Sequence, residues 1–357
     1  MSIETYVNEF ERRDWQTTTE GTVRFAVIGL GWWTIDEAIP SISDSDLCEA
    51  TVAVSSSAEK AERVASDVST MSHGITYDEF QDGAARDAYD AIYICSPNAL
   101  HLPYVETAAE FGKAVFCEKP MEASVERAQE MITLAEDAGI PLLIGYRMHT
   151  EPAIRRAREL IRDGAIGRPV QALGNNSQSL LSINDDPEQW RLNPDLAGPG
   201  TSVTDIGIYP LNTARFLLDA DPVAVQAQMD SDHEAFTDVP DERAAFTATM
   251  DDGTLLACTT SQNAQSSTSL RIIGTDGEIH LEPAFHMETE LRLTCGETTV
   301  DLSTAQVDQM TEILTYFADR VLSGERIGPD GEHGLVDLRA IEAIYEAASA
   351  GQTIEIE

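Results

Sequence analysis

Lys119 stands where chemistry is expected. The apolar run Ala114–Cys117 is followed at once by Glu118, Lys119 and Pro120, and the 357-residue chain has only two other lysines beside twenty arginines. An apolar run of this length, bounded by proline, is typical of a buried parallel strand. Because ligands of open α/β sheets bind beyond the carboxyl ends of the strands, Lys119 is predicted to lie at a ligand site.

A glycine turn near the start of the chain predicts a dinucleotide site. Gly29-x-Gly31-x-x-Thr34 carries two of the three glycines of the dinucleotide fingerprint and follows the apolar segment Val23–Ile28. Glycines between a strand and a helix let the backbone approach a pyrophosphate at the N-terminus of the helix. A tight turn without a ligand is the alternative interpretation of the same residues.

The end of the next predicted strand favours NADP over NAD. The fingerprint is completed by an acidic residue that holds the ribose 2′-hydroxyl, but this chain has Ser55, Ser56 and Ser57 there. Nothing at these positions repels a 2′-phosphate, the hydroxyls can donate hydrogen bonds to it, and Lys60 follows one helical turn later. Ser57 also suits the N-cap of the following helix, and the two roles are compatible.

Ser96-Pro97-Asn98, with His101 just beyond, ends the fourth predicted strand at the same edge of the sheet. Such a turn can bring hydroxyl, amide and main-chain groups close to the nicotinamide ribose. It is also an ordinary turn sequence, and His101 is equally suited to start the next helix. The seven histidines show no metal-binding spacing, so no catalytic metal is predicted.

Alternating strands and helices must position these residues. We expect strands at Val23–Ile28, Glu49–Val54, Gly74–Tyr77, Ala91–Cys95, Ala114–Cys117 and Pro141–Ile144, and helices at Ala58–Val68, Leu100–Phe111 and Ser124–Ala138. Alternation at these lengths implies an α/β fold with a parallel, doubly wound sheet and right-handed crossovers.

The second half of the chain has a different pattern. Turn signals at Asp252-Gly253 and Asp276-Gly277 predict hairpins in a largely antiparallel sheet. Its strands are expected to begin at Val170, Val223, Ala245, Thr254, Leu270, Glu278 and Leu291, and its helices to cover Glu151–Arg162, Val203–Leu218, Gln306–Leu322 and Leu335–Ala350. The predicted division is an amphipathic arm at residues 1–21, an NADP-binding domain at 22–147, and a substrate-binding and oligomerisation domain at 148–357.

The composition narrows the class of partner. The formal charge is −39, from 62 acidic and 23 basic residues spread along the chain, so no basic patch is available for nucleic acid or an anionic membrane. Self-repulsion of this size favours a medium in which salt screens it, which indicates a halophilic, cytoplasmic protein. An acidic surface without a special medium is the alternative. The five cysteines are predicted to be reduced thiols, and neither a secretion signal nor a membrane span is expected.

Several short motifs together resemble the glucose-fructose oxidoreductase/inositol dehydrogenase/MocA family. The motifs are GLGWW at 29–33, SPN at 96–98, CEKP at 117–120, GYR at 145–147, QWRL at 189–192, AGPG at 197–200, TDIGIY at 204–209 and DLRAI at 337–341. The likeness covers residues 22–350, and the lysine of EKP is its most specific part. It implies a Rossmann domain followed by an α/β domain whose open sheet often makes a subunit interface.

The same resemblance implies roles for individual residues. By motif match Lys119 is the EKP lysine, and Asp205 and Tyr209 occupy the two positions of a DxGxH-like motif, with tyrosine in place of the histidine of many relatives. Arg147, Trp190 and Arg191 are expected to face the cleft, where they contact cofactor, or else to form an ion pair and a packed aromatic. The predicted cofactor contacts are Gly29, Gly31, Trp32, Trp33, Ser55, Ser56, Ser57, Lys60, Ser96, Asn98, His101, Glu118, Lys119, Arg147, Trp190 and Arg191.

The implied reaction is the NADP-dependent oxidation of an aldose at C1 to the lactone, with D-xylose as the expected substrate. A phenol with an ordinary pKa of about 10 is a poor base at neutral pH unless a cation lies near, and Lys119 is the candidate cation. Lys119 and Tyr209 remain alternative proton acceptors, and Asp205 is expected to orient the sugar or Lys119. Two other functions remain open: an oxidoreductase that retains its NADP(H), and a catalytically silent sugar or NADP sensor.

Overall fold

The chain folds into two compact units in the computed structural model, which describes residues 10, 13, 15, 20–286 and 288–356. We call the first the parallel-sheet unit; it comprises Trp15–Arg147 and Asp308–Leu335. The second, the mixed-sheet unit, includes Met148–Val307 and Val336–Glu357. The predicted N-terminal arm lies largely outside the described residues.

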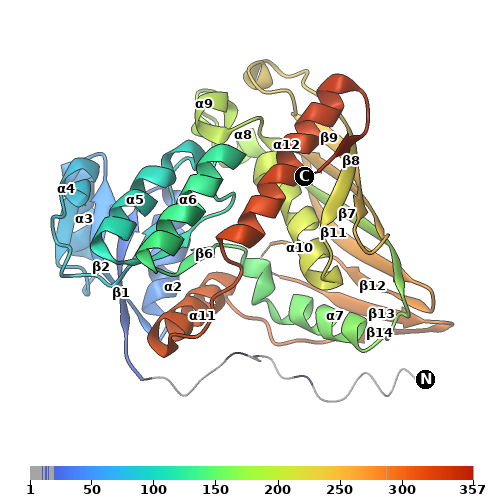
Figure 1. The fold of residues 1–357 in the computed structure, drawn as a ribbon, viewed down its shortest axis with the longest axis horizontal. Coiled ribbons are helices and arrows are strands. Elements are labelled where there is room, and N and C mark those ends of the chain that lie inside the picture. The colour runs from blue at the N-terminus through green and yellow to red at the C-terminus, as the bar shows by residue number, and fades with distance from the viewer. Residues whose placement is uncertain (1–9, 11–12, 14, 16–19, 287, 357) are drawn as a thin grey trace. The chain divides into compact units, whose positions relative to one another are not determined.

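The parallel-sheet unit contains a six-stranded sheet with the order β3-β2-β1-β4-β5-β6, and every neighbouring pair is parallel. Figure 1 labels β1, β2 and β6 of this sheet. The strand order reverses between β1 and β4, as in a doubly wound fold. The predicted parallel sheet is therefore confirmed. The strands are β1 (Val23–Ile28), β2 (Cys48–Ser55), β3 (His73–Thr76), β4 (Ala91–Ile94), β5 (Ala114–Cys117) and β6 (Leu142–Ile144).

Helices cover both faces of this sheet. The side chains of Phe25 and Val27 share one buried core with residues of α2, α3 and α11, whereas α5 packs against β4 and β5 and against α6. The helical segments are η1 (Thr34–Ala38), α2 (Ile39–Ser43), α3 (Ala58–Asp67), α4 (Tyr77–Gln81), η2 (Asn98–Leu100), α5 (Leu102–Phe111), α6 (Val125–Ala138), η3 (Arg147–His149), which crosses the unit boundary, and α11 (Gln309–Ser323).

Helix α11 places a late part of the chain in the first unit. Met310, Ile313 and Phe317 are buried in the same core as Phe25. The domain boundaries predicted from the sequence placed these residues in the 148–357 domain. Periodicity shows that a helix is amphipathic but not which sheet its apolar face covers. Only the tertiary packing therefore reveals that the chain returns to the parallel-sheet unit at α11.

The mixed-sheet unit contains a nine-stranded sheet with the order β14-β13-β12-β11-β7-β10-β9-β8-β15. Its neighbouring strands are antiparallel except for β10 and β7, which run parallel. Both predicted hairpins, β9–β10 and β11–β12, are confirmed. The strands are β7 (Pro169–Ser179), β8 (Pro222–Asp230), β9 (Arg243–Met250), β10 (Leu255–Ser261), β11 (Asn263–Gly274), β12 (Gly277–Leu281), β13 (Leu291–Cys295), β14 (Thr298–Leu302) and β15 (Ile354–Glu355).

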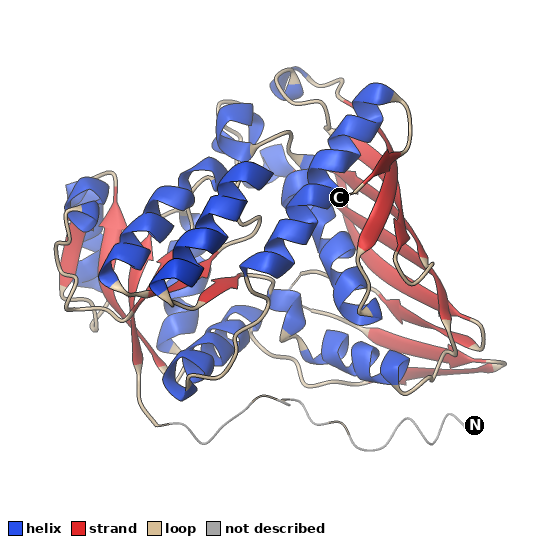
Figure 2. Ribbon diagram, viewed as in Figure 1, coloured by secondary structure: helices blue, strands red, loops and turns tan. Residues whose placement is uncertain are grey.

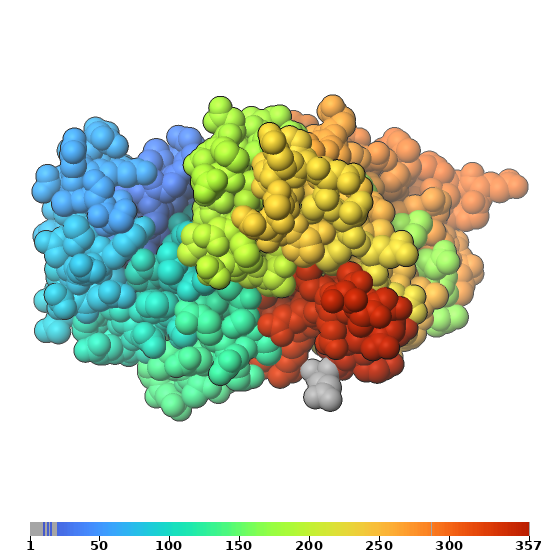
Figure 3. Space-filling view, turned by 90° about the horizontal axis from the view of Figure 1, so that it is seen from above, coloured from blue at the N-terminus to red at the C-terminus, as the bar shows by residue number. Residues whose placement is uncertain are grey.

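Two strands of this sheet have no counterpart in the sequence analysis. β14 pairs with β13 through a short turn at Gly296, and the short β15 pairs with β8 at the opposite edge. The β13–β14 hairpin forms the projection at the right edge of the space-filling view (Figure 3). Both are edge strands, whose existence depends on a partner and not on a strong apolar pattern of their own.

The helices of the mixed-sheet unit lie on one face of its sheet (Figure 2). The helix predicted at Val203–Leu218 is observed as a π-helical segment, η5, that continues directly into α10. α10 packs against α7 and against strands β7, β10 and β11. The helical segments are α7 (Pro152–Arg162), α8 (Leu180–Ile183), η4 (Trp190–Leu192), α9 (Pro194–Ala197), η5 (Ser202–Gly207), α10 (Ile208–Leu218), η6 (Glu234–Phe236) and α12 (Gly331–Ala350), which begins in the parallel-sheet unit.

None of the five cysteines, all of which the structure describes, forms a disulfide, and Cys48, Cys117 and Cys258 are buried. Burial raises the pKa of the Cys48 thiol to about 12. Within the part of the chain that the structure describes, no helix is both long and apolar enough to cross a membrane.

Candidate active site

Gly29 ends strand β1 in a turn that only glycine can make. Its φ is +87°, and a Cβ on this residue would lie 2.1 Å from the carbonyl oxygen of Cys95 at the end of β4. A Cβ on Gly31 would instead meet no atom within 4 Å. The turn is therefore crowded by protein at its first glycine and open at its second, which is the arrangement required for a ligand to approach the backbone.

Thr34 explains the missing third glycine of the fingerprint. It is fully buried, and its hydroxyl donates a hydrogen bond of 2.6 Å to the carbonyl oxygen of Gly29. The side chain thus stabilises the turn from inside. The spacing Gly29-x-Gly31-x-x-Thr34 was available in the sequence, but this hydrogen bond was not predicted.

The two tryptophans after the turn differ in environment. Trp32 is 51% exposed, whereas Trp33 is half-buried, and the guanidinium carbon of Arg147 lies 5.1 Å from the centroid of the Trp33 ring. Arg147 itself is buried. Arg147 therefore packs against an aromatic ring, which was the structural alternative for this residue. A contact of Arg147 with the cofactor stays a prediction.

The three serines at the end of β2 differ in exposure, and their contact with the 2′-phosphate stays a prediction. Ser55 is buried, Ser56 and Ser57 are exposed, and the Ser57 hydroxyl oxygen accepts a hydrogen bond of 3.3 Å from the Lys60 amide. This is the N-cap role expected for Ser57. The cap uses the hydroxyl as an acceptor, so its proton can still be donated to a phosphate oxygen.

The turn after β4 contains a buried hydroxyl without a partner. The Ser96 hydroxyl oxygen is buried and, like several other side-chain oxygens of the described residues, forms no hydrogen bond within the chain. Such atoms in a native fold call for a ligand or a water molecule. Asn98, two residues later, is also buried. The orphaned hydroxyl lies at the same edge as the Gly29 turn and is consistent with a bound dinucleotide.

His101 connects two loops of the parallel-sheet unit. The imidazole is fully buried; Nε2 lies 3.0 Å from the carbonyl oxygen of Ser96, and Nδ1 lies 3.1 Å from that of Met121. Burial lowers the pKa of His101, which favours the neutral ring. The neutral ring lies between the Ser96 turn and the loop after Lys119 and can donate a hydrogen bond to one of the two carbonyl oxygens. A direct contact of His101 with the cofactor stays a prediction.

The residues after β5 lie beside this turn. β4 and β5 are parallel, with Ile94 opposite Cys117, so Ser96 and Lys119 leave the sheet at the same edge. The Glu118 carboxylate accepts a hydrogen bond of 2.8 Å from the hydroxyl of Tyr93, and both Glu118 and Lys119 are half-buried. Lys119 is thus positioned at the carboxyl edge of the sheet by a strand that is itself completely buried.

In the mixed-sheet unit, Asp205 and Tyr209 are the partly exposed residues of a buried helix. All the remaining residues from Thr201 to Arg215 are buried. The four-residue spacing brings Asp205, in the π-helical segment η5, and Tyr209, in the first turn of α10, to one side of the helix. π-helical turns are rare and occur frequently at functional sites.

The Asp205 carboxylate is held by two side chains. Its Oδ2 accepts hydrogen bonds from Arg191 Nε at 3.1 Å and from Gln262 Nε2 at 3.0 Å. The Arg191 guanidinium in turn lies 4.5 Å from the centroid of the Trp190 ring. The ion-pair alternative for Arg191 is therefore observed. Gln262 was not predicted, because a glutamine just after a strand gives no signal of its own.

Phe285 was also missed, and it packs behind Tyr209. The ring centroids of Tyr209 and Phe285 are 6.1 Å apart, and Phe285 is fully buried. Its φ of +67° lies in the left-handed region, which a non-glycine residue adopts only when its surroundings hold it there. No local pattern in the sequence indicates such a residue.

The predicted site residues therefore form two sets. Gly29, Gly31, Ser96 and their neighbours share the carboxyl edge of the parallel sheet and fit a dinucleotide, whereas Asp205 and Tyr209 belong to the mixed-sheet unit. Lys119 and Tyr209 lie in different units, and their pairing stays a prediction. Within the described residues there is no group of three or more His, Cys, Asp or Glu side chains that could hold a metal ion.

Both halves of the chain match known families. An oxidoreductase family with an NAD-binding Rossmann fold matches residues 23–146, and the GFO/IDH/MocA C-terminal domain matches residues 154–280. The first match includes the Gly29 turn and Lys119, and the second includes Asp205 and Tyr209.

Individual relatives resemble the chain over nearly its whole length. D-xylose 1-dehydrogenase [NADP(+)] of Haloarcula marismortui is 51% identical, with 100% of both chains covered. D-xylose 1-dehydrogenase (NADP(+)) 2 of Haloferax volcanii is 29% identical, covering 93% of this chain and 99% of the relative. The crystal structure of aldose-aldose oxidoreductase from Caulobacter crescentus, complexed with glycerol, has a TM-score of 0.87 at 30% identity, covering 94% of this chain and 100% of that one.

Proposed function

Because the chain belongs to the GFO/IDH/MocA oxidoreductase family, we propose that it oxidises D-xylose at C1 to D-xylono-lactone with NADP as the hydride acceptor. The observation that carries the proposal is the 51% identity over the full length to a D-xylose 1-dehydrogenase that uses NADP. Asp205 and Tyr209, the partly exposed residues of a buried helix, support a sugar site of the same kind.

The cofactor is assigned to the carboxyl edge of the parallel sheet. The open backbone at Gly31 is suited to the pyrophosphate, and the unpartnered Ser96 hydroxyl is suited to the nicotinamide ribose. The hydroxyls of Ser56 and Ser57, with the Lys60 ammonium, are suited to the 2′-phosphate of NADP and would offer an NAD ribose no acidic partner.

The sugar chemistry is assigned to Lys119, Tyr209 and Asp205. When bound, the nicotinamide accepts the hydride that leaves C1. The C1 hydroxyl must lose its proton as this happens, and the phenolate form of Tyr209, whose charge the Lys119 ammonium stabilises, takes it and becomes the neutral phenol. The same ammonium stabilises the negative charge that develops on the sugar oxygen. Asp205, held by Arg191 and Gln262, accepts a hydrogen bond from a sugar hydroxyl and orients the ring.

One alternative has an observation of its own. The likeness to an aldose-aldose oxidoreductase, with a TM-score of 0.87, favours an enzyme that keeps NADP(H) bound and reduces a second sugar. Free NADPH would then not accumulate when a single aldose is added. Protein purified from cells would instead carry nucleotide that absorbs near 340 nm, the usual NADPH band.

The experiment that tests the proposal is the initial rate of NADPH formation at high potassium chloride, across a panel of pentoses and hexoses. We expect D-xylose to give the highest kcat/KM. A hexose differs by one hydroxymethyl group, so discrimination of roughly 10-fold to 200-fold is expected from a pocket. Absence of turnover on every sugar, with NADP still bound, would leave a sugar or NADP sensor as the function.

The uncovered face of the nine-stranded sheet supports a homo-oligomer. Along β9 the residues alternate between exposed and buried, and Leu173 and Leu255 on neighbouring strands are 42% and 54% exposed. A sheet face with these apolar side chains is suited to a second copy of the chain. We assign the assembled enzyme to a high-salt cytoplasm, since its charge of −39 requires screening. Light scattering at high salt measures the number of subunits.

A further inference from the structure

Helix α12 runs antiparallel to the η5–α10 helix and is tied to it at two buried points. The Thr204 hydroxyl lies 3.1 Å from the hydroxyl of Tyr345, and the Asn212 amide donates a hydrogen bond of 2.7 Å to the Asp337 carboxylate. Thr204 and Asn212 are eight residues apart, and so are Tyr345 and Asp337. Eight residues correspond to about two helical turns, so one register accounts for both ties.

The first tie also holds the start of η5. The buried carboxylate of Asp241 accepts hydrogen bonds from the amides of Thr201 at 2.7 Å and Val203 at 2.8 Å, and from the hydroxyl of Tyr345 at 2.6 Å. A Cβ on Gly200 would lie 2.3 Å from the Asp241 carboxylate and 2.6 Å from the Tyr345 hydroxyl. The second glycine of the AGPG motif is therefore required for Tyr345 and Asp241 to reach this helix.

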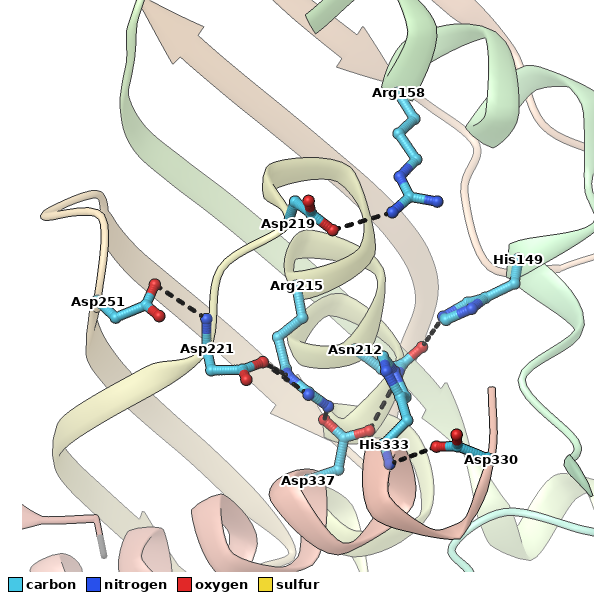
Figure 4. Close-up of polar contacts among 10 residues, drawn as sticks. All are labelled: His149, Arg158, Asn212, Arg215, Asp219, Asp221, Asp251, Asp330, His333 and Asp337. Atoms are coloured by element: carbon cyan, nitrogen blue, oxygen red, sulfur yellow. Dashed lines mark hydrogen bonds and ion pairs between the residues drawn. The ribbon is translucent and has the colours of Figure 1, made fainter. Parts of the chain in front are cut away.

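The second tie belongs to a buried network, shown in Figure 4. The Asp337 carboxylate, which is fully buried, accepts from Asn212 on one oxygen and from Arg215 at 2.7 Å on the other. Arg215 also forms an ion pair with Asp221. The side-chain amide oxygen of Asn212, Oδ1, lies 2.9 Å from Nε2 of His149. Asn212 is thus held from both sides, by α12 and by the segment before α7.

The two ties bracket the proposed sugar residues. Asp205 follows Thr204 directly, and Tyr209 lies three residues before Asn212. The segment between the ties includes the π-helical turn, in which the hydrogen bonds of an ordinary α-helix are interrupted. The two ties therefore hold this segment from outside the helix, one at each end of it.

We propose that Tyr345 and Asp337 are positioning residues that set the orientation of Asp205 and Tyr209 toward the sugar. The inference rests on the proposed function of Asp205 and Tyr209. Each tie uses a buried polar group whose desolvation must be offset by its hydrogen bonds. Buried polar ties of this kind specify one register of the two helices, which apolar contacts alone define less strictly.

The test compares Tyr345→Phe and Asp337→Asn with Glu346→Gln, a control that removes a charge from the exposed side of α12 next to Tyr345. Phenylalanine keeps the buried ring, and asparagine keeps the shape of the carboxylate, so both variants should fold. We expect kcat on D-xylose to fall roughly 10-fold to 10²-fold in each, since small displacements of a reacting group have effects of this size. The NADP dissociation constant of both variants should equal that of the wild type. The control Glu346→Gln should keep the wild-type kcat as well.

The pH profile of kcat separates positioning from loss of folded enzyme. A smaller folded fraction lowers kcat equally at every pH. A displaced proton acceptor no longer meets the sugar in the same geometry, so the acid limb of the profile should move in Tyr345→Phe. Wild-type kcat in both variants, or a uniform loss without any movement of the acid limb, would overturn the proposal.

Hydrogen exchange keeps this inference separate from the proposed function. Amides of residues 203–212 should exchange faster in both variants than in the wild type, whether or not a sugar is oxidised. If the wild type oxidises no sugar, the proposed function fails, and the exchange rates still decide whether the ties hold this segment. If the amides of residues 203–212 exchange at the wild-type rate in both variants, Tyr345 and Asp337 do not hold this segment and the proposal is wrong.

Discussion

The hydroxyl of Thr34 donates a hydrogen bond of 2.6 Å to the carbonyl oxygen of Gly29, in the turn proposed to hold the cofactor pyrophosphate. Replacing Thr34 by valine keeps the volume and removes the donor. The Gly29 carbonyl would then be buried without this partner, which destabilises the ordered turn by about 1 kcal/mol. Because NADP must bind the ordered turn, this cost should weaken NADP binding by up to about fivefold. Thr34→Ser keeps the donor and should bind NADP as the wild type does. Fluorescence titration with NADPH measures both, and equal affinities in all three proteins would show that the bond does not support the cofactor turn.

Lys60 is predicted to determine the preference for NADP. In Lys60→Ala the ratio of kcat/KM with NADP to kcat/KM with NAD should fall by about tenfold, since a hydrogen bond to a charged group contributes roughly 1.5 kcal/mol. Arg63→Ala is the matched control, because it removes a positive charge from an exposed position on the same helix, α3. If the ratio is unchanged in Lys60→Ala, the role assigned to Lys60 is wrong.

Tyr209→Phe should lower kcat by roughly 10²-fold or more, the usual effect of removing a general base. Phenylalanine keeps the packing of the ring against Phe285, so the fold and the NADP affinity should be retained. Steady-state rates with D-xylose and a separate NADPH titration give the two quantities. Near wild-type turnover would exclude Tyr209 as the base and leave Lys119 as the proton acceptor.

Asp241 predicts a particular dependence of stability on pH. Burial raises the pKa of its carboxyl to about 6, against an ordinary value of about 3.9 in the unfolded chain. Between these values the folded chain binds more protons than the unfolded chain, so Asp241 lowers the free energy of unfolding as the pH rises from about 4 to about 6. Asp241→Asn cannot titrate and should lack this contribution.

Thermal unfolding at constant high salt checks the prediction. The Tm of the wild type minus that of Asp241→Asn should be larger near pH 4.5 than near pH 7, because ionisation of the buried Asp241 carboxyl destabilises only the wild type as the pH rises. The variant also loses a hydrogen-bond acceptor for the amides of Thr201 and Val203, which changes the difference by the same amount at every pH. A difference in Tm that does not vary with pH would show that Asp241 is ionised throughout this range.

The charge of −39 predicts stability that rises with salt. The Debye length shrinks from about 10 Å at 0.1 M to about 3 Å at 1 M, so self-repulsion of the folded chain is strongest in dilute salt. The urea midpoint should rise steadily between roughly 0.1 M and 1 M potassium chloride. Urea is the suitable denaturant because it adds no ions. A midpoint independent of salt would favour an acidic surface without adaptation to a saline medium.

Much of the fold could be read from the sequence because its signals are local. Buried parallel strands appear as short apolar runs such as Ala114–Cys117, and the two hairpin turns carry the residues that their geometry demands. The family resemblance drawn from short motifs is confirmed by the matches to both halves of the chain. The weak edge strands β14 and β15 lacked such signals and were missed.

The sequence by itself determined which residue types are available for chemistry: a lone lysine after β5, serines in place of an acid after β2, and an aspartate four residues before a tyrosine. Only the tertiary structure decided what holds them. Three contacts cannot be read from local pattern, and most of them join residues that are distant in sequence. They are the hydrogen bond of Thr34 to Gly29, that of Gln262 to Asp205, and the ties between α12 and the helix of Tyr209. Periodicity records which side of an element is buried, but the partner on that side is chosen by packing of the whole chain.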